Sequence, residues 1–209
     1  GQADLDDAHP EPTAAFFVVP EPDASSGSIG KDNRGAAAMG HDPATEPQSF
    51  TFSGDGRVPN NGLPLLLYRK AARLDLDDPA GRLEDLFTGN GWTDSWRNGI
   101  FPYHHYHSLT HEVLGIAQGH GRVRFGGENG QDFDVNAGDV VVIPAGVGHM
   151  CIEASEDFLV VGAYPPGCGY DLIKADPAAY EAARTRIAKV PKPGTDPLTG
   201  TKGGLLDAW

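Results

Sequence analysis

GIFPYHHYHSLTHEVLGIAQG, residues Gly99 to Gly119, contains four of the chain's eight histidines and one glutamate. Alternate side chains of a strand point to opposite faces, so a strand here would turn His105 and His107 to the same side. Two such imidazoles can converge on one ion, and Glu112, at the start of the next expected strand, adds an oxygen donor. His149, after the turn PAGVG, could supply a third imidazole from a distant strand. The sequence therefore predicts a metal site formed by these four side chains.

The remainder of the chain indicates an all-β fold. From about Phe50 onward, short apolar runs are separated by Gly, Asn, Asp and Pro at roughly ten-residue spacing, a pattern typical of a β-sandwich or barrel. The run LPLLLYR predicts a buried strand. Further strands are expected at 100–107, 112–118, 122–125, 132–135, 140–143, 149–153 and 158–164.

Two short helices are expected at the periphery. Asp78 followed by Pro79 predicts a capped helix start, and the stripe after it consists of Leu83, Leu86 and Phe87. A second helix is predicted from Pro177 to about Lys189, with Asp176 as its cap. The chain after this helix shows no periodicity and is expected to be extended along the barrel surface.

The spacing of nine residues resembles the two sequence motifs of the cupin superfamily. The first motif is matched by Gly99, His105, His107, Glu112 and Gly119, and the second by Gly138, Pro144, Gly146 and His149. At Glu153 the chain departs from the second motif, which usually ends in Asn. The stretches VPNNGLPLLLYR, GDVVVIPAGVGH and DFLVVGAYPPG extend the likeness to single-domain bacterial cupins of the YjlB type, over about residues 50–209.

This resemblance implies a double-stranded β-helix, or jelly-roll, barrel with one divalent transition metal ion on His105, His107, Glu112 and His149. The ion could be Fe, Mn, Ni, Zn, Co or Cu, since all accept this donor set. By analogy, we expect a homodimer and a metal-dependent, dioxygenase-like enzyme whose substrate is a small organic acid. Two alternatives remain open. One is a non-catalytic small-ligand-binding or sensor cupin, and the other is a metal-free sugar isomerase or epimerase.

Tyr103 and Glu153 are the candidate catalytic residues. Strand alternation places Tyr103 on the inward face of the ligand histidines, where it could donate a proton to bound substrate or only fill the barrel. Glu153 and Cys151 alternate with His149 and should also face the cavity, where a carboxylate needs a partner or a proton.

Four other polar residues are expected to lie away from the site. Alternation sends His104 and His111 to the opposite face, which predicts surface or interface packing for both. Arg122 and Arg124 alternate with apolar neighbours in their strand, so we expect both in solvent.

Charge and hydropathy argue against several partners. The chain has 16 Lys plus Arg against 29 Asp plus Glu, and its net charge of -13 makes nucleic acid and anionic membrane surfaces poor partners. The apolar run AAFFVV is too short for a membrane span and lacks the basic flank of a signal peptide. The cysteines, Cys151 and Cys168, are too few for a disulfide framework. These features favour a cytoplasmic protein with a small-molecule ligand.

Composition divides the chain into three segments. Residues 1–49 form an N-terminal extension rich in Pro, Gly, Ala, Ser and Asp, in which FFVV is expected to be an added edge strand. Residues 50–175 form the barrel. Residues 176–209 form a C-terminal helix and an extended tail.

Overall fold

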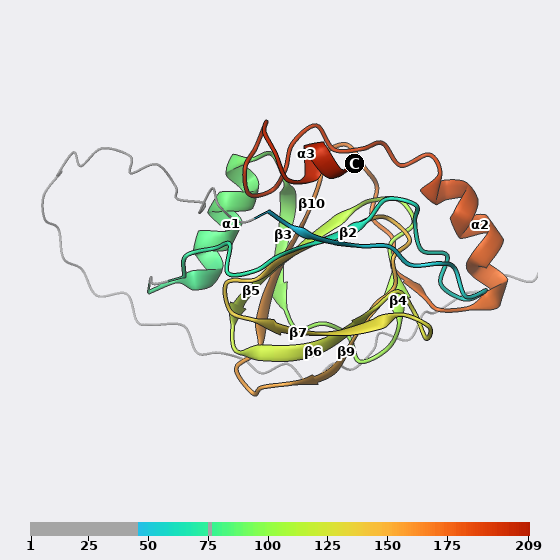
Figure 1. The fold of residues 1–209 in the computed structure, drawn as a ribbon, viewed down its shortest axis with the longest axis horizontal. Coiled ribbons are helices and arrows are strands. Elements are labelled where there is room, and N and C mark those ends of the chain that lie inside the picture. The colour runs from blue at the N-terminus through green and yellow to red at the C-terminus, as the bar shows by residue number, and fades with distance from the viewer. Residues whose placement is uncertain (1–45, 75–76) are drawn as a thin grey trace, which may run out of the picture. The chain divides into compact units, whose positions relative to one another are not determined.

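The strands of this chain are short and mostly pair with strands distant in the sequence. A computed structural model describes residues 46–74 and 77–209 (Figure 1). The predicted edge strand at FFVV lies outside the described residues. The elements are β1 (Gln48–Phe50), β2 (Leu65–Tyr68), α1 (Pro79–Gly89), β3 (Thr93–Asn98), β4 (His105–Tyr106), β5 (Glu112–Gln118), β6 (His120–Phe125), β7 (Gln131–Asn136), β8 (Val140–Ile143), β9 (His149–Ala154), β10 (Leu159–Tyr164), β11 (Ile173–Lys174), α2 (Pro177–Ile187) and α3 (Leu205–Ala208).

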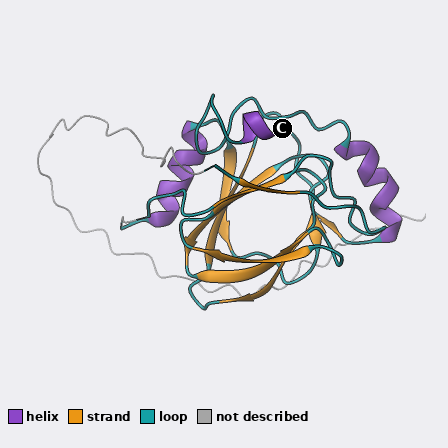
Figure 2. Cartoon of the chain, viewed as in Figure 1, coloured by secondary structure: helices purple, strands orange, loops and turns teal. Residues whose placement is uncertain are grey.

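Two antiparallel sheets form the barrel (Figure 2). One has the strand order β1-β2-β8-β5-β10-β3, and the other has the order β11-β4-β9-β6-β7. Neighbouring strands are therefore rarely consecutive in the chain, which is the connectivity of a jelly roll. The predicted all-β jelly-roll fold is confirmed.

Buried residues lie on both faces of the first sheet. On β2, Leu65 and Leu67 belong to the cluster inside the barrel, which also contains Leu114 and Phe125. Their neighbours on the same strand, Leu66 and Tyr68, join an outer cluster with α1 and the C-terminal tail. Burial on both faces explains why LPLLLYR is continuously apolar instead of alternating.

Both predicted helices are present, and each begins directly after its predicted capping residue. The Asp78 carboxylate accepts from the Gly81 N–H at 2.9 Å, and Asp176 accepts from the Ala178 N–H at 2.9 Å. Helix α1 packs on β3, β5 and β10 through fully buried Leu83 and Phe87, whose burial contributes about 2–3 kcal/mol each.

The tail after α2 is more ordered than the sequence predicts, because a buried carboxylate organises it. Asp196 accepts from the Tyr68 hydroxyl at 2.5 Å and from the backbone N–H groups of Leu198 and Leu205 at 2.7 Å each. The tail also contains the short helix α3, a correction to the expected extended chain. None of the helices in the described part of the chain combines the length and apolar character that a bilayer span needs.

Candidate metal centre

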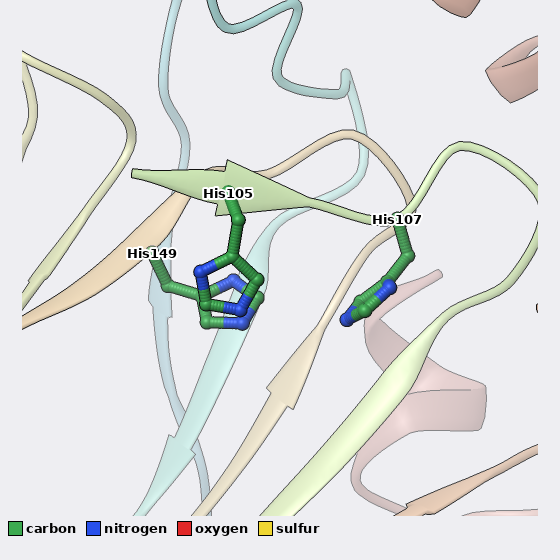
Figure 3. A group of neighbouring side chains, drawn as sticks. All are labelled: His105, His107 and His149. Carbon is green, nitrogen blue, oxygen red and sulfur yellow. The ribbon is translucent and has the colours of Figure 1, made fainter. Parts of the chain in front are cut away.

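Three histidines meet where the two-residue strand β4 pairs with β9. His105 on β4 is the register partner of His149 on β9, and their ring centroids are 4.1 Å apart. His107 follows the end of β4, so its ring approaches the other two from one side (Figure 3). One ring nitrogen from each of the three lies within 4.8 Å of the others, and all three residues are buried. The histidine triad could therefore hold a metal ion.

Glu112 places a carboxylate beside this triad. It begins β5, opposite Ile143 of β8, and is only 2% exposed. Its Oε2 lies 3.3 Å from Nε2 of His107 and 3.4 Å from Nε2 of His149. Despite these distances, that oxygen makes no hydrogen bond of ordinary geometry to any described residue. A buried carboxylate oxygen without a hydrogen bond is costly, and a metal ion would satisfy it.

Backbone carbonyls fix the orientation of all three imidazoles. The Nδ1 atom of His105 faces the Tyr103 carbonyl at 3.2 Å, and that of His149 faces the Val147 carbonyl at 3.3 Å. His107 Nδ1 contacts the carbonyl of Asp171. When Nδ1 carries the hydrogen and donates it, Nε2 keeps a free lone pair that can bind an ion.

The Asp171 side chain in turn braces the loop after β4. It accepts from the Ser108 N–H at 2.7 Å, the Ser108 hydroxyl at 2.5 Å and the Leu109 N–H at 3.2 Å. These bonds tie the segment of Asp171 to the residue that follows His107, which positions the carbonyl that orients the His107 ring.

Close packing shifts the pKa values of three side chains in the cluster away from their ordinary values. Burial and the neighbouring His149 lower the pKa of His105 to about 3. Burial acts to raise the pKa of Glu112, but His107 and His149 beside it hold that pKa well below its usual range. Burial also opposes charge on His107, yet the Glu112 carboxylate raises its pKa. The site thus combines an ionised Glu112 carboxylate and a neutral His105 with a proton held on His107, and a bound metal ion would displace that proton.

The chemistry of the four donors fits a transition metal. Three imidazole nitrogens and one carboxylate oxygen suit Mn, Fe, Co, Ni, Cu and Zn, and an octahedral ion on four protein donors keeps two positions for other ligands. The donors lie in the wall of a cavity of about 450 Å³, to which His105, His107, Glu112 and His149 all contribute.

Two tyrosines of this cavity escaped the sequence argument. The Tyr164 hydroxyl accepts from the Trp96 indole N–H at 2.8 Å, and burial together with the Glu112 carboxylate raises the pKa of Tyr164 well above its ordinary value. Tyr170 lies with its ring centroid 5.2 Å from that of His107. Tyr164 ends a predicted strand, and Tyr170 follows it in the loop YPPGCGYD, but neither belongs to the spaced motifs.

Tyr103 does not line this cavity, which corrects its predicted inward placement. The strand begins only at His105, so alternation cannot be extended back to Tyr103. Its ring instead stacks on Phe101 at 5.1 Å and lines a neighbouring pocket with Lys174. Its ring also lies edge-on to the His105 ring, with centroids 5.8 Å apart, and its backbone carbonyl faces His105 Nδ1.

Glu153 lies outside the barrel, and its predicted place in the cavity is wrong. The ladder between β6 and β9 shifts register after Arg122, so Cys151 pairs with Val123 while Glu153 pairs with Arg122. The irregularity leaves Ile152 unpaired and turns Glu153 outward. Its carboxylate lies 3.4 Å from Arg122 Nη1 with 67% of the side chain exposed. Cys151 is half-buried and is not among the cavity-lining residues.

The other histidines of the opening stretch are buried within the chain, contrary to the expected surface or interface packing. His111 accepts from the Ala145 N–H at 3.0 Å, and its ring packs against Trp209 at 4.7 Å. The C-terminal tail covers it, which strand alternation cannot reveal. His104 is 8% exposed and lies 3.9 Å from the Glu128 carboxylate.

The arginines of β6 lie on the outer face, as expected. Arg122 pairs with Asp134 at 3.1 Å, and Arg124 pairs with Asp132 at 2.6 Å.

A jelly-roll barrel with a histidine triad and an adjacent glutamate in its cavity is the architecture of a cupin, and a family model described as Cupin matches residues 92–165. The chain belongs to the cupin family. More narrowly, it is YjlB-like: it is 43% identical over 165 residues to "Uncharacterized protein YjlB" of Bacillus subtilis (strain 168), and the match covers 78% of this chain and 97% of that protein.

Solved structures resemble the chain more remotely. Acireductone dioxygenase from Bacillus anthracis, with a cadmium ion in its active centre, is 19% identical at a TM-score of 0.32, over 48% of this chain and 76% of the dioxygenase. Procruciferin, an 11S globulin from Brassica napus, is 16% identical at a TM-score of 0.32, over 54% of this chain and 23% of the globulin. The chain thus spans less than a quarter of the globulin.

Proposed function

We propose that this protein is a metal-dependent enzyme that binds one divalent transition metal ion through His105, His107, Glu112 and His149 and acts on a small organic acid, with dioxygenase-like chemistry. The observation that carries the proposal is the buried Glu112 oxygen, which lacks a hydrogen bond although two imidazole Nε2 atoms lie within 3.4 Å of it. A cation is the partner that this arrangement needs.

The ion, when bound, would supply a Lewis acid and, if redox-active, an electron-transfer centre. The chain supplies the rest of the site. Carbonyls of Tyr103, Val147 and Asp171 hold the imidazoles in one orientation, so the donors are preorganised. The raised pKa of Tyr164 keeps a proton on its phenol oxygen, and in this position the hydroxyl can donate to an oxygen of a bound ligand.

The cavity walls favour reaction away from bulk water. Leu114, Ile100 and Leu172 line the cavity beside the four polar donors. An apolar wall lowers the local dielectric and strengthens the attraction between the donors and the charges of a ligand.

Elemental analysis of protein purified without added metal tests the site. We expect about one ion per chain in the wild type and a large loss in His107→Ala and His149→Ala, with a folded barrel by circular dichroism. His120→Ala is the matched control, because His120 is an exposed histidine on β6. Full metal retention by either ligand variant would refute the assignment.

Oxygen uptake with a panel of small organic acids then tests the chemistry. Uptake that depends on His149 and stops in chelator would support the dioxygenase-like proposal. Bound metal without turnover would favour a ligand-binding or sensor role. Turnover of a sugar that persists in chelator would favour the metal-free isomerase or epimerase alternative.

A further inference from the structure

Aromatic rings at the metal cavity indicate the class of compound that it takes. In the described part of the chain, the exposed large hydrophobic side chains are Phe101, Ile152 and Tyr170, with 41%, 40% and 58% exposure. Phe101 and Tyr170 both line the metal cavity, and Ile152 does not. Exposed apolar side chains gathered at a cavity are typical of a ligand-binding surface.

These two rings flank the histidine triad. The Phe101 ring lies edge-on to His105, with centroids 5.3 Å apart. The Tyr170 ring is tilted against His107, with centroids 5.2 Å apart. A ligand bound at the triad would therefore lie near two aromatic side chains, one against His105 and one against His107.

The inner wall of the cavity adds apolar surface. Trp96, Ile100 and Leu114 line the cavity, and the indole N–H of Trp96 is already taken by the Tyr164 hydroxyl. A flat hydrophobic ligand would meet aromatic or aliphatic groups over much of its surface.

The cavity also lacks a free cationic side chain among the described residues. Among the described residues that line the cavity, Arg97 is the one with a permanently cationic side chain, and its guanidinium donates to both carboxylate oxygens of Glu84, at 2.8 and 2.7 Å. Oδ1 of Asp78 also lies 3.5 Å from Nη1 of this guanidinium. Two carboxylates therefore neutralise Arg97, and a second acidic group on a ligand would find no opposite charge beyond the metal ion.

We infer that the ligand is a hydroxylated aromatic compound whose oxygen binds at the metal ion and whose ring lies against Phe101 and Tyr170. This inference rests on the proposed function, because the metal ion anchors the oxygen. It changes the expected substrate from small organic acids in general to hydroxylated aromatic compounds with at most one strongly acidic group, and it makes Phe101 and Tyr170 the specificity-determining residues.

Two matched probes separate ring from charge. Catechol and oxalate each present two oxygens to a metal, but catechol carries an aromatic ring and oxalate carries two carboxylates. Anaerobic isothermal titration calorimetry of the metal-bound full chain should show tighter binding of catechol than of oxalate. Phe101→Ala and Tyr170→Ala should each weaken the binding of catechol about tenfold without changing the binding of oxalate. Ile152→Ala is the matched control, since this equally exposed side chain lies outside the cavity lining.

Metal content measured on every sample after titration separates this inference from the proposed function. Two results with metal bound would overturn the aromatic assignment and leave the metal site intact. One is tighter binding of oxalate than of catechol, and the other is a catechol affinity that is unchanged in both Phe101→Ala and Tyr170→Ala. Wild-type protein that holds no metal yet binds catechol through the two rings would support the aromatic class and refute the metal-dependent function. Failure of both metal and catechol to bind would refute both.

Discussion

His111 carries a pH dependence of folding that can be measured in metal-free protein. Its Nδ1 accepts from the Ala145 N–H at 3.0 Å, and its Nε2 donates to the Pro191 carbonyl at 3.2 Å, so a second ring proton would break the first bond. Burial lowers the pKa of His111 to about 4, although the Pro191 carbonyl partly opposes this effect. In the unfolded chain the same imidazole titrates near the ordinary value of about 6.5.

The sign and size of the effect follow from this difference. Between pH 6.5 and pH 4 the unfolded chain binds a proton that the folded protein does not, so stability falls as the pH falls through that window. Above the window His111 has no effect. At about 1.4 kcal/mol per pKa unit, the loss in the free energy of unfolding is about 1.3 kcal/mol at pH 5.5 and reaches about 3 kcal/mol by pH 4.

Urea unfolding at pH 7.5 and 5.5 measures this loss while both solutions stay above the sequence pI of about 4.8. His111→Gln is the comparison, because its amide can accept from Ala145 and donate to Pro191 without titrating. His105 and other groups titrate in both proteins, so their contributions cancel. The wild type should lose about 1.3 kcal/mol more than the variant between the two pH values. Equal losses would show that His111 is not the titrating group.

Two further predictions concern residues around the site. Asp171→Ala should weaken metal binding about 10–100-fold while the barrel stays folded, because the segment that orients His107 loses its anchor on Ser108. A metal competition titration measures this affinity. An unchanged metal affinity would contradict the bracing role of Asp171. Glu153→Gln should leave metal content and any turnover unchanged, and should alter the free energy of unfolding by less than about 0.5 kcal/mol, because its ion pair with Arg122 is exposed. Loss of turnover in this variant would show that Glu153 takes part in the reaction.

Residue spacing predicted that the three histidines and Glu112 would lie close together, because each of them stands at a strand end or tight turn whose position the motifs fix. Gly138 and Gly146 both adopt positive φ, of 92° and 88°, and at Gly146 an added Cβ would lie 2.7 Å from the Asn60 carbonyl oxygen. Glycine is needed at such turns, so the turns and the side chains that follow them can be read from the sequence.

The positions of Tyr103 and Glu153 could not be predicted in this way. Alternation is reliable only within an unbroken ladder, but the ladder shifts register between Arg122 and Val123 and β4 contains only two residues. Neither feature is visible in the apolar pattern, so strand alternation placed Glu153 and Tyr103 in a cavity that neither side chain lines. Likewise, nothing local to His111 indicates that Trp209 will cover it, since that contact joins distant parts of the chain.

The register pair His105 and His149 also has a consequence for folding kinetics. Its two histidines come from strands far apart in sequence, and Glu112 joins them from the other sheet, so the ligand set is complete only when the barrel has closed. Such long-range closure is slow, and contacts completed after the transition state affect the unfolding rate and leave the folding rate nearly unchanged. A metal ion bound at this cluster would therefore lengthen the lifetime of the native state without hastening its formation.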